Sequence, residues 1–271
     1  MTQSKIDERS KRFLGDVLEW TVAYSNPAQV SHIYRQRIND PLRIPNDRKL
    51  KNIYYNYIHI YFENSDVMSL FERGAHENDM YHFIRAYTRS NSFNTTLNYH
   101  LAANVLFYFE FILYDTIDYQ LVKCLIDFVA LFIYRQELCE YIFNGTVYRE
   151  VVMTEKDLFK HVVGSRIMNT SFLSTSKDKQ VAEFFSEQKQ HKFAVLGTYV
   201  IHNKNNRRTA LDISDISCFP HEREVLILPF SAFYVKRVKR PANDSEPIEM
   251  ILVEDDSNTL ENIDTITLVD Y

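Results

Sequence analysis

The feature that most constrains the fold is a change of residue pattern near Gly145. Before it, apolar residues across 97–140 recur at the i, i+3, i+4 spacing of helices, and charged residues interrupt each run. After it, short β-branched runs alternate with helical patterns. The sequence therefore predicts an α+β protein with a helical N-terminal lobe packed on a strand-rich C-terminal lobe. Strands are expected at residues 146–152, 193–201, 224–228 and 233–238, and helices at 155–163 and 179–190.

Two segments of the first lobe are harder to assign. Residues 53–62 (IYYNYIHIYF) are so aromatic that a helix and a strand both remain open. Residues 91–98, rich in Ser, Asn and Thr, are typical of a polar turn that opens a helix.

The predicted organisation has three parts. Residues 1–52 form an N-terminal helical extension, and residues 53–240 form the main domain, helical to about 145 and β-rich after it. Residues 241–271 form a tail with nine acidic residues and no Lys or Arg. Alternating apolar residues in the tail favour edge strands at 249–253 and 265–269, lying on the basic body of the protein. A linker or partner-binding segment is the alternative.

Composition excludes several functional classes. Only five glycines are present, and neither GxGxxG nor GxxxxGK[ST] occurs, which argues against a glycine-rich phosphate loop. Without the tail, 31 basic residues face 27 acidic ones, a balance too mild for a nucleic-acid binder. The nine histidines form no HExxH motif, so no metal is expected.

The chain also lacks features of exported and membrane proteins. Its charged start is unlike a signal peptide, and its most apolar stretches, 105–114 and 125–134, are too short to span a bilayer. Three cysteines without a CxxC motif are typical of a reduced intracellular protein. We therefore expect a soluble, cytoplasmic protein with no membrane span and no nucleic-acid partner.

Two glutamates two residues apart, Glu222 and Glu224, are the first candidate site residues. They stand where Pro220 precedes an apolar strand, and residues i and i+2 of a strand point to one face. Like charges held this close disfavour each other's ionisation, which suits a site that stabilises a positive charge. The alternative is a solvated strand entrance.

Arginine and serine residues supply further candidates. Arg149 lies within an apolar strand, where its guanidinium either binds a phosphate or forms an ordinary surface or internal ion pair. In residues 171–178, Thr175 or Ser176 is expected to cap the next helix, which leaves the Ser174 hydroxyl for a polar ligand. A basic loop could reach phosphates or an acidic protein, or could be a solvated turn; it contains Lys204, Arg207 and Arg208.

In this order, the three elements resemble the Arg–Ser–Glu signature of arginine-specific mono-ADP-ribosyltransferases, a family that includes cholera-toxin-like enzymes. The matching segments are residues 148–149 (YR), 171–176 (SFLSTS) and 219–226 (FPHEREVL). Weaker matches are residues 85–88 (RAYT), 97–98 (LN), 181–185 (VAEFF) and 212–214 (DIS). The resemblance covers roughly residues 54–238 and implies a β-sandwich-like ADP-ribosyltransferase core.

The resemblance also implies roles for the glutamates and an activity. Glu224 matches the catalytic glutamate, and Glu222 matches the upstream glutamate associated with arginine as acceptor. The implied reaction transfers ADP-ribose from NAD, the co-substrate, to an exposed arginine of a protein substrate without a metal. Two alternatives stay open: an NAD glycohydrolase, and a non-catalytic module of the same fold that binds NAD.

Further implied roles concern the binding of NAD. Arg149 matches the arginine that holds the nicotinamide ribose or phosphate, and Ser174 matches the serine that supports the ribose. Thr175 and Ser176 match residues that steady the glutamate strand. Glu150 stands where the family usually has a glycine whose backbone contacts nicotinamide; it offers the same backbone groups and adds a carboxylate beside the pocket.

Overall fold

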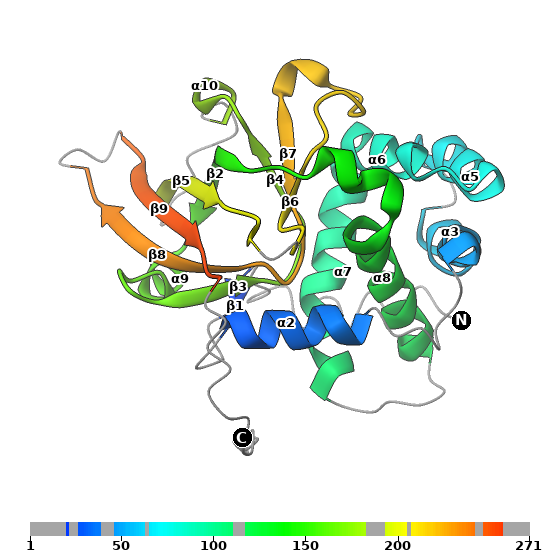
Figure 1. Ribbon diagram of the computed structural model, residues 1–271, viewed down its shortest axis with the longest axis horizontal. Helices are drawn as coiled ribbons and strands as arrows, with labels where there is room; N and C mark the ends of the chain where they lie inside the picture. Colours follow the sequence, from blue (N-terminus) through cyan, green and yellow to red (C-terminus); the bar gives the residue numbers. More distant parts are fainter. Residues whose placement is uncertain are drawn as a thin grey trace.

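The computed structural model describes residues 20–21, 27–38, 46–62, 65–110, 117–182, 193–204, 207–241 and 246–256. Helices gather on one side of the molecule and a single mixed sheet lies on the other (Figure 1). The α+β class, with its helical lobe before residue 145 and all strands except the two-residue β1 after it, is thereby confirmed.

The helical lobe is built around aromatic side chains. The rings of Phe71, Phe83, Phe93 and Phe128 are fully buried, and the Phe71 and Phe93 ring centroids lie 4.8 Å apart. Such residues dominate the energetics of a core because each one buries a large apolar area. The described elements are α2 (Pro27–Ile38), α3 (Asn46–Ile53), η1 (Tyr54–Ile58), α4 (His59–Tyr61), α5 (Met68–Glu77), α6 (Met80–Arg89), α7 (Asn91–Glu110), α8 (Ile117–Tyr134) and η2 (Gln136–Tyr141).

The structure settles the two ambiguous segments. Most of the aromatic stretch is helical, because η1 is a π-helical turn within a run from α3 to α4. The expected polar turn at 91–98 is wrong, since these residues already form the start of α7. Ser90 precedes that helix and its Oγ accepts the N–H of Phe93 at 3.4 Å, so the polar residue that starts the helix lies before the segment.

All nine described strands belong to one sheet, in the order β1-β3-β8-β9-β5-β2-β4-β7-β6. The four predicted strands are confirmed, whereas β1, β3, β4 and β6, each of four residues or fewer, were not predicted. Helix α9 (Glu155–Lys160) ends before the predicted residue 163, and α10 (Lys179–Ala182) is the described part of the helix predicted to end at 190. The strands are β1 (Trp20–Thr21), β2 (Gly145–Met153), β3 (Arg166–Asn169), β4 (Leu173–Ser176), β5 (Phe193–Ile201), β6 (Ala210–Asp212), β7 (Glu224–Ile227), β8 (Ala232–Lys239) and β9 (Ile248–Glu254).

The acidic tail contributes an interior strand, so the expected edge position was wrong for residues 249–253. Strand β9 lies between β5, to which it is parallel, and β8, to which it is antiparallel. The tail also pairs with basic residues, since Lys204 Nζ lies 2.7 Å from Asp256 and Arg166 Nε lies 3.5 Å from Asp255. Residues 265–269 lie outside the described residues, and the domain boundaries at 52 and 240 stay a prediction.

Alternation along the strands divides the apolar residues between two cores. In β7, Val225 and Ile227 belong to a core shared by most strands, whereas Leu226 packs with the helices. The core shared by the strands contains Tyr199 of β5 and Phe233 of β8, whose ring centroids lie 5.7 Å apart. This is the sandwich-like arrangement expected for the strand-rich lobe.

Helix α2 joins the two lobes. It runs below the sheet toward α7 and α8 in Figure 1, and it contacts β3, β8 and α8. Arg35 of α2 is buried and donates to the carbonyl oxygens of Arg208 at 3.3 Å and Pro229 at 3.2 Å, and to Ser231 Oγ at 2.9 Å. Its guanidinium thus satisfies backbone carbonyl groups that burial would otherwise leave unpaired. None of the described helices combines the length and the apolar character needed to cross a bilayer.

Asn169, at the end of β3, joins several backbone segments through its side-chain amide. Its side-chain nitrogen donates to the carbonyl oxygens of Ser171 at 2.7 Å and Leu228 at 2.9 Å. Its side-chain oxygen accepts the N–H of Ser231 at 2.7 Å. The amide therefore fixes the entrance to β4 against the exit from β7.

We expect Asn169→Ala to lower the free energy of unfolding by about 3 kcal/mol, because buried backbone groups lose their partners. Urea unfolding measures this change. The matched control is Asn56→Ala, whose exposed side chain bonds to Asn52 at 2.8 Å and whose loss should cost under about 0.5 kcal/mol. Equal effects of the two substitutions would contradict the role of Asn169.

Candidate active site

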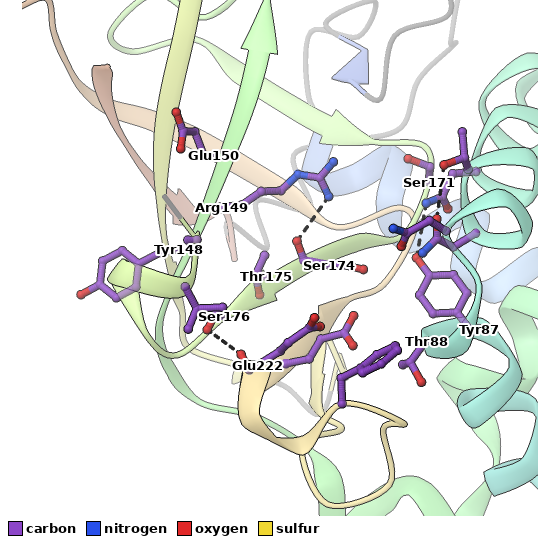
Figure 2. Close-up of a pocket in the computed structure, with 18 of the residues that line it drawn as sticks. Tyr87, Thr88, Tyr148, Arg149, Glu150, Ser171, Ser174, Thr175, Ser176 and Glu222 are labelled. Carbon is purple, nitrogen blue, oxygen red and sulfur yellow. Dashed lines mark hydrogen bonds between the residues drawn. The ribbon is translucent and has the colours of Figure 1, made fainter. Parts of the chain in front are cut away.

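A cavity of about 690 Å³ opens between the helical lobe and the sheet. Helices α6 and α7 form one wall, and strands β2, β4 and β7 with the loop before β7 form the other. The structure brings the predicted residues of strands 146–152 and 224–228 and of segments 171–176 and 219–224 to this cavity, and Figure 2 shows most of them around it. The predicted residues that line it are Arg149, Glu150, Ser174, Thr175, Ser176, Glu222 and Glu224.

The two glutamates meet at the cavity for a different reason from the one predicted. Only Glu224 belongs to β7, whereas Glu222 ends a short 3₁₀ helix that begins at Pro220. Between them Arg223 has a φ of 50°, in the left-handed region. The i, i+2 strand argument was therefore wrong, because a turn and not strand alternation aims Glu222. Glu224 is buried, with 6% of its surface exposed, while Glu222 is partly exposed.

Strand pairing places Ser174 beside Glu224. In the antiparallel β4–β7 pair, Ser176 faces Glu224 and Ser174 faces Leu226, so the two serines and Glu224 share one side. Burial is the main reason that the pKa of Glu224 rises to about 7; the charge of Glu222 raises the pKa further, while the Ser174 hydrogen bond and Arg149 oppose the rise. The carboxyl group thus titrates near neutral pH.

Arg149 extends from β2 toward Ser174. Its Nη1 donates to the Ser174 carbonyl oxygen at 3.4 Å, and Figure 2 shows this contact as a dashed line. The guanidinium is close enough to Glu224 to lower the pKa of that carboxyl group. The neighbouring Glu150 carboxylate points away from Ser174 and Glu222 in Figure 2. A cation suited to a phosphate therefore lies on the cavity side of this strand.

Thr175 and Ser176 bond to the backbone of the glutamate segment. Thr175 Oγ1 donates to the carbonyl oxygen of Val225 at 2.5 Å, and Ser176 Oγ donates to that of Glu222 at 2.7 Å. The predicted helix cap was wrong, since the Asp178 carboxylate accepts the N–H of Gln180 at the start of α10. These hydroxyl groups therefore hold the loop that carries both carboxylates.

The helical wall contributes residues that sequence reasoning did not place in the site. Tyr87 of α6 is fully buried, and burial and the charge of Glu224 raise its pKa, so it is a neutral phenol near neutral pH. Its hydroxyl interacts with Ser174 and accepts a hydrogen bond from Asn98 of α7 at 3.3 Å. The available signal was the weak resemblance of residues 85–88 and 97–98, which contain both residues.

A second contact fixes the glutamate loop to the same wall. The N–H of Cys218 donates to Thr88 Oγ1 at 3.0 Å, and the Cys218 thiol donates to the carbonyl oxygen of Arg85 at 3.4 Å. Cys124, Cys139 and Cys218 are all free thiols. Cys218 here acts as a positioning contact between α6 and the loop.

The three basic residues of the predicted basic loop bind other parts of the chain. Arg208 is buried and donates to the carbonyl oxygen of Arg135 at 2.8 Å, while Arg207 donates to that of Asp255 at 3.1 Å. Lys204 pairs with Asp256, and none of the three lines the cavity. The loop therefore connects the tail with the helical lobe.

A group of potential metal ligands lies elsewhere. Glu77, Asp79 and His82 have ligand atoms within 4.8 Å of one another, and it is the only such group found in the described part of the chain. His82 Nε2 is 3.3 Å from Glu77 and 3.7 Å from Asp79. None of the three lines the cavity between the lobes.

Comparison with known proteins identifies the family. The family model for NAD:arginine ADP-ribosyltransferases matches residues 76–258, more than half of the chain, including every predicted site residue. The chain belongs to this family. The match establishes NAD-dependent ADP-ribosyl transfer as the class of reaction.

Solved structures that match the chain share little sequence identity with it. The type III effector XopAI of Xanthomonas axonopodis pv. citri has 16% identity and a TM-score of 0.48, covering 85% of this chain and 93% of its own. The ADP-ribosyltransferase Vis toxin of Vibrio splendidus has 17% identity and a TM-score of 0.45, covering 89% and 92%. HopU1, an ADP-ribosyltransferase of Pseudomonas syringae pv. Tomato DC3000, has 14% identity and a TM-score of 0.41, covering 86% and 99%. A search of curated protein sequences found no match.

The raised pKa of Glu224 predicts a pH-dependent cost to stability. The folded protein binds the proton of the Glu224 carboxyl group more tightly than the unfolded chain does, because the pKa of that group is near 4.5 when the chain is unfolded. The resulting contribution to the free energy of unfolding is fully present below pH 4.5 and is lost as the pH rises through about 7. We expect Glu224→Gln, which cannot ionise, to be more stable than the native protein by up to about 3 kcal/mol at about pH 8 and little changed at about pH 5.

Thermal unfolding at the two pH values measures this difference. Glu246→Gln, at an exposed position outside the cavity, is the matched control and should leave the melting temperature unchanged at both. A stability gain of the same size at both pH values would show that the ionisation of Glu224 is not its source.

Proposed function

We propose that this ADP-ribosyltransferase transfers ADP-ribose from NAD to an arginine side chain of a protein substrate, releasing nicotinamide and a proton. The observation that carries the proposal is the pair of carboxylates at one cavity, one buried and one near its mouth. The buried group suits the cleavage of NAD, and the partly exposed group suits an acceptor that arrives from solvent.

Glu224 is the residue proposed to promote cleavage. Breaking the bond between nicotinamide and ribose leaves positive charge on the sugar, as in glycoside hydrolysis. An ionised carboxylate in a site of low dielectric stabilises this charge more in the transition state than in the ground state. The hydrogen bond from Ser174, itself in contact with Tyr87, orients the carboxylate before substrate arrives.

Arg149 and the cavity are proposed to bind NAD. The cavity volume falls within the range of small-molecule sites. The Arg149 guanidinium can bind a phosphate oxygen or the nicotinamide ribose beside Ser174, while the Glu150 backbone can contact the nicotinamide amide. The arrangement would place the sugar near the Glu224 carboxylate.

Glu222 is proposed to activate the acceptor. A guanidinium group has a pKa above about 12 and is a poor nucleophile until it is oriented and loses a proton. Its nitrogen would attack the ribose carbon as the bond to nicotinamide breaks, with the bonding pair leaving on nicotinamide. The Glu222 carboxylate, close enough to Glu224 to raise the pKa of that group, would accept the proton. If water took the place of the acceptor, the product would be free ADP-ribose.

The two glutamates should have separable effects. We expect Glu224→Gln to reduce nicotinamide release by at least about 10²-fold, because transition-state charge loses its partner. We expect Glu222→Gln to retain slow NAD hydrolysis but to lose transfer to agmatine, a small guanidine acceptor. Both are measured by incubating the protein with labelled NAD and agmatine and separating nicotinamide, ADP-ribose and ADP-ribosyl-agmatine.

Glu246→Gln serves again as the control and should behave as the native protein. Nicotinamide release without modified agmatine in the native protein would instead identify an NAD glycohydrolase. No release at all would favour a non-catalytic module, with Glu150 as its sequence hint. If both glutamine variants kept native transfer, the assignment of the glutamates would be wrong.

The pH dependence of NAD cleavage offers an independent check. Because the pKa of Glu224 is about 7, cleavage should decline as the pH falls below neutral. Removing the negative charge of Glu222 should lower the pKa of Glu224, so the hydrolysis profile of Glu222→Gln should shift toward acid. Glu150→Gln, which changes another carboxylate that lines the cavity, should leave the pH at which cleavage declines unchanged.

A further inference from the structure

Three strongly exposed apolar residues lie together at the end of α9 and in the turn that follows it. Phe159 is 71% exposed, Val162 54% and Val163 62%. Only Tyr55 and Ile60 among the other large apolar residues described are more than half exposed, and they lie in the helical lobe. Isolated exposed apolar residues are normal, but three within five positions form a patch that calls for a partner.

The local structure holds these side chains outward. Thr154 and Asp157 form a capping box at the start of α9, and Leu158 is buried beneath the helix. The following turn is closed by a bond from the Ser165 N–H to the Val162 carbonyl oxygen at 2.9 Å. The patch is therefore part of a firmly bonded helix and turn.

Basic side chains lie on the strand next to this apolar tip. The Gly164 N–H donates to the Val235 carbonyl oxygen at 2.8 Å, which places the turn beside the exposed Lys236 and Arg237 of β8. Residues 154–166 and 232–241 together contain seven basic side chains and two carboxylates. Two of the seven pair with carboxylates of the neighbouring tail, Arg166 with Asp255 and Lys239 with Glu249, each at 3.5 Å. Of the two carboxylates within these segments, Asp157 is engaged in the capping box.

This combination matches the surface of an anionic bilayer. Apolar side chains at such a tip can enter the boundary between headgroups and acyl chains, while Lys and Arg bind the anionic headgroups. An acidic protein would account for the basic residues but not for a protruding tip of bulky apolar groups. We propose that α9, its turn and the adjoining part of β8 form a peripheral docking surface for membranes that contain anionic phospholipid.

The position of the surface is compatible with a separate active site. None of the residues 154–166 or 232–241 lines the cavity between the lobes. In Figure 1, α9 lies at the far side of the β-rich lobe from α5 and α6. Docking through α9 would therefore leave the cavity available, and the proposal does not depend on the identity of the acceptor.

Flotation of the full chain with vesicles tests the proposal. We expect the protein to float with vesicles of phosphatidylcholine containing about 30% phosphatidylserine, but not with phosphatidylcholine alone. Binding should weaken as salt rises toward about 0.5 M because the charges become screened. No flotation, or equal flotation with neutral vesicles, would overturn the proposal.

Matched variants separate the two components of the surface. Phe159→Ser with Val163→Ser should weaken vesicle binding about tenfold, and so should Lys236→Glu with Arg237→Glu. The controls are Tyr55→Ser with Ile60→Ser, and Arg48→Glu with Lys51→Glu, at exposed positions of the helical lobe; both should bind as the native protein does.

Two outcomes would contradict the assignment even if the vesicles bind. If Phe159→Ser with Val163→Ser weakens binding no more than its control, Tyr55→Ser with Ile60→Ser, the apolar tip is not the membrane contact. Poly-glutamate serves as the model of an acidic protein. If Lys236→Glu with Arg237→Glu lost binding to poly-glutamate while vesicle binding remained native, the surface would be a site for an acidic protein. Release of nicotinamide in solution should be unchanged in every variant, which confirms that each one is folded.

Discussion

The antiparallel pairing of β4 with β7 is the constraint on which the site depends. Its register opposes Ser176 to Glu224 and Ser174 to Leu226, so the serines and the buried glutamate face the same cavity. Hydroxyl groups on β4 then bind the backbone that carries both carboxylates. A shift of this register by one residue would turn Ser174 into the sandwich core and Leu173 into the cavity.

The helical lobe gives this strand pair its electrostatic character. Tyr87 and Asn98 close the cavity from the other side, and burial is the main reason that the pKa of Glu224 is raised. A strand-rich lobe alone would expose the carboxylate to water, where its pKa would be ordinary. The contacts of α2 and Cys218 join the lobes and therefore help to position the site. They act through its geometry and not through contact with the substrate.

Sequence reasoning recovered what depends on local pattern and on residue chemistry. It placed the change of fold near Gly145, and the resemblance to the Arg–Ser–Glu family placed Arg149, Ser174 and Glu224 together at one site. The prediction for Glu222 was wrong, because the direction of its side chain depends on the left-handed backbone conformation of Arg223, which the residue type does not indicate. It also missed Tyr87, since a buried tyrosine in a helix has the same pattern whether it packs in a core or lines a site.

The interior position of β9 shows a different limit. Its alternating residues Ile248, Met250 and Leu252 indicate a strand with one buried face, but the order of strands is set by pairing at long range. The acidic end of that strand reinforces the pairing, because Glu254 accepts the N–H groups of His202 and Asn203 at 2.6 and 2.7 Å. The acidic tail thus stabilises the fold at the point where its carboxylate accepts backbone N–H groups.

The alternation of β4 and β7 finally explains how this fold accommodates chemistry. One face of each strand supplies the sandwich core, through Leu173, Val225 and Ile227, whose close packing is sensitive to changes of side-chain size. The other face meets a cavity, where polar residues contact substrate or one another. Since the stabilising and reactive residues occupy opposite faces, Ser174 and Glu224 can change with little loss of core packing. The cost of the buried carboxylate is local, and the sandwich core offsets it.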